Sequence, residues 1–429
     1  MSRSLIMINK LPISRRKAMT ILVSPSGFKE SIQADVVADC IEDGILRVVP
    51  NAIIRKAPLV DGGEGFTHAL VSVTRGELKN IQVLGPVHKP VASYYGFLGG
   101  NSRTAVIEMA AAAGLRLVPK SSPDLGRTTT YGVGELIRAA LDDGAERILI
   151  GCGDSGTNDG GAGMIQALGG RLLDADGNEL PTAGGGNDLI RLSTIDLSGL
   201  DPRLQKVPIE APCNWSNVLC GPKGVARVFG PQKGASPAQV EALAAALDTY
   251  ASAAKRELGY DISTAPGSGA SGGLGTGLLL IGATLRSRFE LIMKYFCIDK
   301  LMEGCDLVVT AEGGIDSQTP RGKIPAEVAR RAKRQGLPVI ALAGTVGVDA
   351  DVNYSAGIDA FSSIMQCPTS LECAIRDTER LLRDSAESMM RMVIVGRELK
   401  EVRSKVADDT AVLTWNTFAI KPVMRVNTA

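Results

Sequence analysis

The chain alternates short apolar runs with alanine-rich amphipathic segments, and this alternation restricts the fold more than any other feature. The runs TILVSP (20–25), RILIGCG (147–153) and CDLVVTAEG (305–313) each pass into glycine, proline or polar residues. The segments YGVGELIRAALDDG (131–144) and AEVARRAKRQ (326–335) have the apolar spacing of helices. Strands that alternate with helices predict an α/β fold with a mainly parallel sheet covered on both faces.

The middle of the chain, residues 82–285, is richer in glycine than its flanks and contains a β-like segment, VASYYGFLGGNSRTAVIEMA. We interpret it as a second domain inserted into a first domain. That first domain is assembled from residues 19–81 and 286–394. In such sheets ligands bind at the carboxyl ends of the strands, so the loops after the strands are the places to search for chemistry.

The two ends of the chain differ from this pattern. Residues 1–18 contain five basic residues and no acid, and they form either an extension or an organellar targeting segment. Residues 395–429 show no convincing periodicity and are interpreted as a C-terminal appendage.

Composition excludes several classes of function. The 429 residues include 47 Lys or Arg and 46 Asp or Glu, so no global basic field attracts nucleic acid or anionic lipid. No apolar run approaches the roughly 18 residues of a membrane-spanning helix. Eight scattered cysteines without a CxxC pair and only two histidines argue against a zinc site and favour a reducing compartment. We therefore expect a cytoplasmic protein with small-molecule ligands, and composition does not predict its oligomeric state.

Two short stretches share an Asp-Gly-Gly core: VDGGEGF (60–66) and NDGGAG (158–163). Glycine permits positive φ and close approach of a ligand to the backbone. The acid beside it suits a metal ligand or a proton acceptor, but it equally closes an ordinary Asx turn.

Three further loops carry candidate ligand groups. TAEGGIDSQTPRGKIP (310–325) offers two carboxylates for Mg²⁺ and then two cations for phosphate at the start of a helix. FGPQKGAS (229–236) contains Lys233, and PGSGASGGLGTG (266–277) could bind phosphate through backbone N–H groups. Ordinary surface charges, a solvated turn and close helix packing are the alternatives. No GxxxxGK[ST] motif is present, and no GxGxxG follows the first strand.

Taken in order, these motifs resemble those of the glycerate kinases that phosphorylate D-glycerate at its 2-hydroxyl. The matching stretches include SPSGFKES, VDGGEG, IEMAAAAGL, GCGDSGTNDGGAGM, CGPKGVARVFGPQKGA, PGSGASGGLG and TAEGGIDSQTPRGKIP. The resemblance extends from about Met19 to Ser388. The resemblance implies a flavodoxin-like domain built from both ends of the chain, with an inserted restriction-endonuclease-like α/β domain. It also implies ATP and Mg²⁺ as cofactors.

The resemblance implies roles for individual residues. Asp316 with Glu312 would hold Mg²⁺, Lys29 and Lys323 would offset phosphate charge, and Asp61 or Asp159 would take the hydroxyl proton. The further residues expected to bind substrate or nucleotide are Ser31, Gly62, Gly63, Glu64, Asn158, Gly160, Gly161, Lys233, Ser268, Gly269 and Arg321.

One departure from the family pattern concerns catalysis. Many relatives have Asp where this chain has Asn214, so Asn214 would only position the hydroxyl. Phosphoryl transfer tolerates this, because its loose transition state depends more on positioning than on a base. Three other functions stay open: a non-catalytic module that binds a hydroxy acid, a kinase for a related small hydroxy acid, and a nicotinamide-dependent oxidoreductase.

Overall fold

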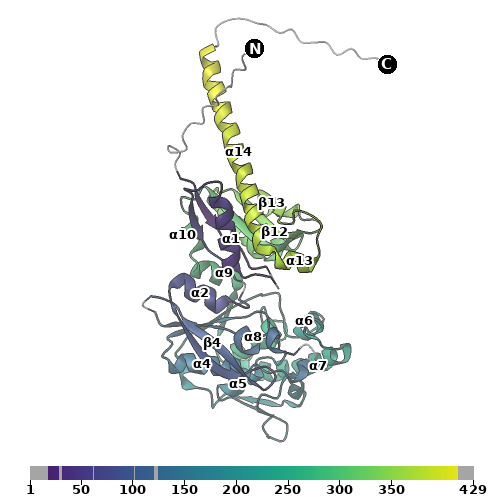
Figure 1. Ribbon diagram of the computed structural model, residues 1–429. Coiled ribbons are helices and arrows are strands. Elements are labelled where there is room, and N and C mark those ends of the chain that lie inside the picture. Colours follow the sequence, from purple (N-terminus) through teal and green to yellow (C-terminus); the bar gives the residue numbers. More distant parts are fainter. Residues whose placement is uncertain (1–17, 29–30, 61, 101, 120–123, 414–429) are drawn as a thin grey trace, which may run out of the picture.

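The computed structural model describes residues 18–28, 31–60, 62–100, 102–119 and 124–413, and it forms two lobes joined side by side (Figure 1). Lys29 and Asp61 lie outside the described residues. Each lobe is built on its own β-sheet. In the described part of the chain no helix is both long and apolar enough to cross a membrane.

The first lobe contains a five-stranded sheet in the order β13-β12-β11-β1-β2, and every neighbouring pair is parallel. Its strands are β1 (Thr20–Val23), β2 (Ile53–Lys56), β11 (Leu307–Ile315), β12 (Val339–Val346) and β13 (Ala360–Ser363). Apolar side chains on both faces of β1 and β11 are buried, as a parallel sheet covered on both sides requires.

Helices cover both faces of this sheet. On one face α1 (Ala34–Leu46) and α14 (Thr378–Leu413) pack against it, and their side chains share one hydrophobic core with β1. On the other face lie α10 (Ile298–Met302) and α11 (Ile324–Arg334), whereas α9 (Arg288–Tyr295) contacts strands of the second lobe. The short helices α12 (Val352–Ser355) and α13 (Leu371–Arg376) complete the lobe. The expected α/β architecture with a parallel sheet is confirmed here.

The second lobe contains a six-stranded mixed sheet in the order β10-β9-β6-β5-β4-β3. The strands β5, β6, β9 and β10 are parallel, whereas β4 and β3 form an antiparallel edge. Their bounds are β3 (Glu77–Leu84), β4 (Pro90–Phe97), β5 (Thr104–Glu108), β6 (Arg147–Gly151), β9 (Ile209–Cys213) and β10 (Thr284–Ser287), and a separate ribbon pairs β7 (Arg171–Leu173) with β8 (Thr194–Asp196). The sequence placed the inserted domain at residues 82–285, whereas this sheet also includes the start of β3 and the end of β10.

Helices of the second lobe follow local sequence signals. The longest, α7 (Pro237–Leu258), begins with a capping box between Ser236 and Gln239 and ends at Gly259, whose φ of 78° suits glycine. The others are α2 (Phe66–Thr74), α3 (Ala110–Ala113), α4 (Tyr131–Asp142), α5 (Ala162–Ala167), α6 (Val225–Phe229) and α8 (Ala270–Leu280). Single 3₁₀ turns lie at Leu115–Leu117, Leu125–Arg127, Gly186–Arg191, Pro202–Gln205, Pro231–Lys233 and Thr319–Arg321.

The C-terminal segment begins as a helix. Residues 395–413 continue α14, which extends away from the first lobe (Figure 1). The helix is anchored by its first half, where Leu382 and Met390 are fully buried, while Met392 and Leu399 are exposed.

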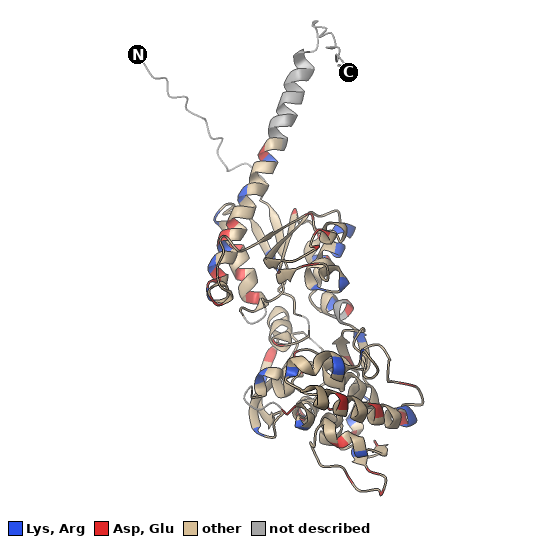
Figure 2. Cartoon of the chain, turned by 90° about the vertical axis from the view of Figure 1, so that its right-hand side faces the viewer, with Lys and Arg blue, Asp and Glu red and all other residues tan. Residues whose placement is uncertain are grey.

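Charged residues of both signs are interspersed over the two lobes (Figure 2). This distribution agrees with the near balance of acidic and basic residues in the sequence.

Candidate active site

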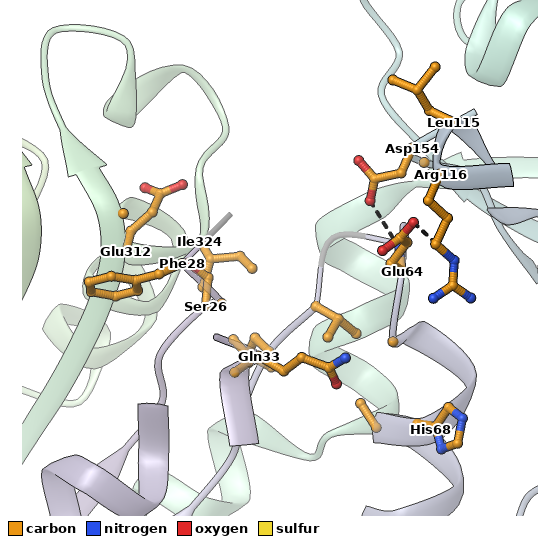
Figure 3. Close-up of a pocket in the computed structure, with 18 of the residues that line it drawn as sticks. Ser26, Phe28, Gln33, Glu64, His68, Leu115, Arg116, Asp154, Glu312 and Ile324 are labelled. Atoms are coloured by element: carbon orange, nitrogen blue, oxygen red, sulfur yellow. Dashed lines mark hydrogen bonds and ion pairs between the residues drawn. The ribbon is translucent and has the colours of Figure 1, made fainter. Parts of the chain in front are cut away.

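A cleft of about 1910 Å³ lies between the lobes, at the carboxyl ends of strands from both sheets. The first lobe contributes the loop after β1 and residues of β11. The second lobe contributes the loops after β6 and β9 and the start of α8. The polar residues that line it include Ser26, Ser31, Gln33, Glu64, Arg116, Asp154, Ser155, Asn214, Asn217, Lys233, Ser271, Glu312 and Lys323, several of which are drawn in Figure 3.

The loop after β2 approaches the loop after β6 through glycines. A Cβ at Gly153 would come within 2.5 Å of the Cα of Gly63, so a side chain there would push the loops apart. Gly62 has a φ of 90°, which glycine adopts without strain. Beside them the Glu64 N–H donates to the Asp154 carboxylate at 3.0 Å, and the Glu64 carboxylate pairs with Arg116 at 3.4 Å (Figure 3).

Glu108, the last residue of β5, fixes the turn that leads into α2 through hydrogen bonds. Its buried carboxylate accepts hydrogen bonds from the N–H groups of Gly65 and Thr67 at the start of α2 and from the Tyr94 hydroxyl. Burial raises the pKa of Glu108, and these three donors oppose that rise. The residue was not among the predicted candidates. An acid inside the apolar run AVIEMA was the available signal, because a buried carboxylate persists only when it is hydrogen-bonded.

The family resemblance implied Asp159 as a possible proton acceptor, but this residue does not line the cleft. It is fully buried, and its carboxylate accepts from the N–H and hydroxyl of Thr130 and from the N–H groups of Gly161 and Gly163. Burial raises the pKa of Asp159, and the same donors oppose the rise. The carboxylate therefore joins the start of α4 to the start of α5 and does not line the cleft.

The described glycines of the two Asp-Gly-Gly turns have different neighbours and do not line the cleft. Gly160 packs against the ring of Tyr250 and Gly161 against α8, while Gly62 and Gly63 pack against residues 152–153. Asn158 is fully buried, and neither polar atom of its side chain has a hydrogen-bond partner among the described residues. Both turns thus support loops of the cleft, but the described glycines do not face each other across it.

Asp154 lies in the same loop as Asp159 but reaches the cleft. Its φ of 46° is in the left-handed region, where a residue with a Cβ is disfavoured. The strands β6 and β9 are parallel neighbours, so Asp154 and Asn214 follow strands that end at the same edge of the sheet. Asp154 was also missed, although it belongs to the matched stretch GCGDSGTNDGGAGM.

Asn214 lines the cleft with its side chain fixed in a turn. Its Oδ1 accepts from the N–H of Ser216 at 3.1 Å and from the Ser216 hydroxyl at 2.8 Å. Two other predicted residues of this lobe, Ser268 and Gly269, do not line the cleft and pack within the lobe. The Ser268 hydroxyl accepts from the Leu219 N–H at 3.0 Å, and Gly269 lies against the backbone of Val218.

The first lobe contributes Lys323, which immediately precedes α11. Its Nζ donates to the Gly314 carbonyl at 3.1 Å and forms an ion pair with Asp316 at 3.4 Å. Burial raises the pKa of Asp316, but the Gln318 N–H and the Lys323 ammonium outweigh this and lower it overall. Arg321 is exposed and does not line the cleft. Ser31 lines the cleft and donates to Thr378 at 2.7 Å, which ties the first loop to the start of α14.

The two residues predicted to hold Mg²⁺ have different surroundings. Glu312 lines the cleft, whereas Asp316 does not line it and forms an ion pair with Lys323. Among the described residues, no three acidic, histidine or cysteine side chains gather as metal ligands. Of the two predicted carboxylates, Glu312 is the one placed to contact a Mg²⁺ ion in the cleft.

The fold and cleft define a two-lobed α/β protein with cationic and anionic groups on both walls, and comparisons with known proteins give the family. The model of the Glycerate kinase family matches residues 21–394, and this chain belongs to that family.

Individual relatives agree with the family assignment. The chain is 46% identical over 376 residues to "Glycerate kinase" of Bacillus subtilis, covering 86% of this chain and 98% of the relative. It is 44% identical over 359 residues to "Glycerate 2-kinase" of Escherichia coli, covering 83% and 93% respectively. The crystal structure of a "putative glycerate kinase 2 from Salmonella typhimurium LT2" superimposes with a TM-score of 0.77 at 43% identity, covering 89% of this chain and all of that one.

Proposed function

We propose that this protein transfers the γ-phosphoryl group of ATP to the 2-hydroxyl of D-glycerate, giving 2-phospho-D-glycerate and ADP. The observation that supports this best is one cleft with a lysine on each wall, Lys323 from the first lobe and Lys233 from the second, in a glycerate kinase chain. Two separate cationic groups suit the two anions that the reaction brings together, a nucleotide and a hydroxy acid.

The first lobe would bind the nucleotide. Lys323 stands where α11 begins, and both its ammonium group and the helix N-terminus attract phosphate. Asp316 would position Lys323 through their ion pair. Mg²⁺, held by Glu312 and phosphate oxygens, would neutralise charge on the phosphates. ATP and Mg²⁺ are thus part of the proposal.

The second lobe would bind the acceptor. Asp154 is the carboxylate of the loop after β6 that lines the cleft, whereas Asp159 is committed to backbone donors and Asn214 cannot accept a proton at neutral pH. We assign to Asp154 the orientation of the 2-hydroxyl and the removal of its proton. Approach of the lobes around both ligands would exclude water and so suppress ATP hydrolysis.

A coupled assay of ADP release with D-glycerate, L-glycerate and related three-carbon acids tests the proposal, and phosphorus NMR identifies the product. We expect ADP release that depends on D-glycerate and a 2-phospho product. A 3-phospho product would correct the site of transfer. Glycerate binding in calorimetry without any ADP release from Mg·ATP would instead show a non-catalytic binding module.

A further inference from the structure

Lys233 is a buried cation without an anionic partner. Its side chain is 5% exposed, and its Nζ donates to the Ser155 hydroxyl and to the Thr157 carbonyl, each at 2.8 Å. Both acceptors are neutral. No carboxylate in the described part of the chain forms an ion pair with this ammonium group. Burying an uncompensated ammonium group is unfavourable, so a counter-ion is the missing element.

The charged groups around Lys233 do not supply that counter-ion. The carboxylate that raises its pKa from a distance is that of Asp159, which is already committed to the donors of Thr130, Gly161 and Gly163. Asp154, next to Ser155 in the chain, accepts from the Glu64 N–H. Burial outweighs the effect of Asp159 and lowers the pKa of Lys233 to about 7.

The position of Lys233 makes the ammonium group available to a ligand. It lines the cleft together with Ser155, Asn217 and Ser271, all from the second lobe. Two of its three N–H bonds are used within the protein, which leaves one for a ligand atom. A single cation with one remaining donor matches a singly charged carboxylate better than a phosphate chain.

We propose that Lys233 is the binding site for the carboxylate of the acceptor, so that the protein selects hydroxy acids over neutral polyols. The inference rests on the proposed function for the identity of the acid, D-glycerate. The buried ammonium would gain its counter-ion only when the acid is bound. Neutral glycerol, which has the same carbon chain with a hydroxymethyl group in place of the carboxylate, would leave that cation uncompensated.

Calorimetric titration of D-glycerate into the full-length protein tests the site without requiring turnover. Lys233→Met is expected to weaken D-glycerate binding about tenfold or more, because a charge-assisted hydrogen bond is lost. The KM for ATP should stay unchanged, and the preference for glycerate over glycerol should narrow. The matched control is Lys56→Met, since Lys56 also lines the cleft but is already paired with Asp39 and Glu42, and its glycerate affinity should equal that of the wild type.

Two results would overturn the site: unchanged glycerate affinity in Lys233→Met, or a loss confined to ATP. If that variant does not fold, the pH dependence of D-glycerate binding to the wild type tests the site. Binding the carboxylate should raise the pKa of Lys233, so glycerate affinity should fall between pH 7 and 9 with proton uptake on binding. A flat affinity across that range would contradict the inference. Should the wild type bind glycerate in this Lys233-dependent way yet release no ADP, the proposed function fails and the carboxylate site stands.

Discussion

The carboxylate of Asp154 accepts a hydrogen bond of 3.0 Å from the backbone N–H of Glu64. This contact joins the loop after β6 to the loop after β2, which connects the two sheets. Because Asp154 also has a left-handed φ of 46°, the chain keeps a disfavoured backbone conformation at a residue that lines the cleft. Such conformations concentrate at functional sites, where surrounding contacts maintain them.

Asp154→Gly separates the chemical role of this carboxylate from its backbone role. Glycine relieves the left-handed conformation, by about 1 kcal/mol, so the variant should fold normally. Loss of the proton acceptor should lower kcat about a hundredfold. Asp154→Asn, which keeps an oxygen for the Glu64 N–H, should be similarly slow if the charge matters. Steady-state kinetics and a thermal melt check this. Full kcat in the glycine variant would remove Asp154 from the mechanism.

Asn214→Asp tests the departure from the family pattern. Aspartate keeps the oxygen that accepts from Ser216, so the turn should persist. We expect an active enzyme whose pH–rate profile is shifted, since a second carboxylate now lies near the acceptor. If the wild type is inactive and Asn214→Asp gains kinase activity, no other residue of the wild type acts as the general base.

Glu108→Gln should act on the cleft indirectly. An amide presents an NH₂ group toward donors at Gly65, Thr67 and Tyr94, which leaves at least one buried donor unpaired. The expected loss of stability is about 1–3 kcal/mol, measured by denaturant unfolding. Displacement of the loop after β2 should also raise KM for D-glycerate. Tyr94→Phe removes a single donor and is the milder control; equal stability of the wild type and Glu108→Gln would argue against this network.

Asp316→Asn should weaken ATP use through Lys323. Without its ion pair the ammonium group is less well positioned, so KM for ATP should rise several-fold and kcat should fall. If Glu312 holds Mg²⁺, added Mg²⁺ should rescue Glu312→Gln but not Asp316→Asn. Rescue of Asp316→Asn by Mg²⁺ would restore the metal role that its sequence position suggested.

The lowered pKa of Asp316 also predicts the pH dependence of that variant's stability. An acid whose pKa is lower in the folded state stabilises the fold above its unfolded pKa, and this contribution disappears as pH falls through the folded value. Any difference in Tm between the wild type and Asp316→Asn should thus be full at pH 7, begin to shrink as pH falls through about 4, and vanish only below the lower folded pKa. It should be small, because the pair is partly exposed.

Lys233 predicts a pH trend of the same sign, but in a more alkaline range, for the wild type without ligand. Its folded pKa of about 7 lies below the ordinary lysine value, so the unfolded chain binds more protons between about pH 7 and 10. Stability relative to Lys233→Met should therefore rise with pH over that interval. Thermal melts of both proteins in a pH series measure it, and parallel curves would show that the ammonium group is not desolvated.

Much of the fold was predictable from local sequence. The strands β1, β6 and β11 and the helices α4 and α11 were expected, because buried strands and amphipathic helices impose their own periods on short segments. The order of the matched motifs likewise predicted the glycerate kinase family. The extension of α14 to Leu413 was not predicted, because residues 395–429 show no convincing helical periodicity.

The sequence by itself determined the parallel α/β architecture, the family and the loops that surround the cleft, because these follow from short-range patterns and the order of motifs. Only the tertiary structure decided which side chains reach that cleft. Asp154 and Asp159 are five residues apart in one loop, yet one lines the cleft and the other is buried against Thr130. Lys233 became an unpaired buried cation only through contacts with Ser155 and Thr157. Burial and hydrogen bonding depend on partners far away in the chain, and no local pattern specifies them.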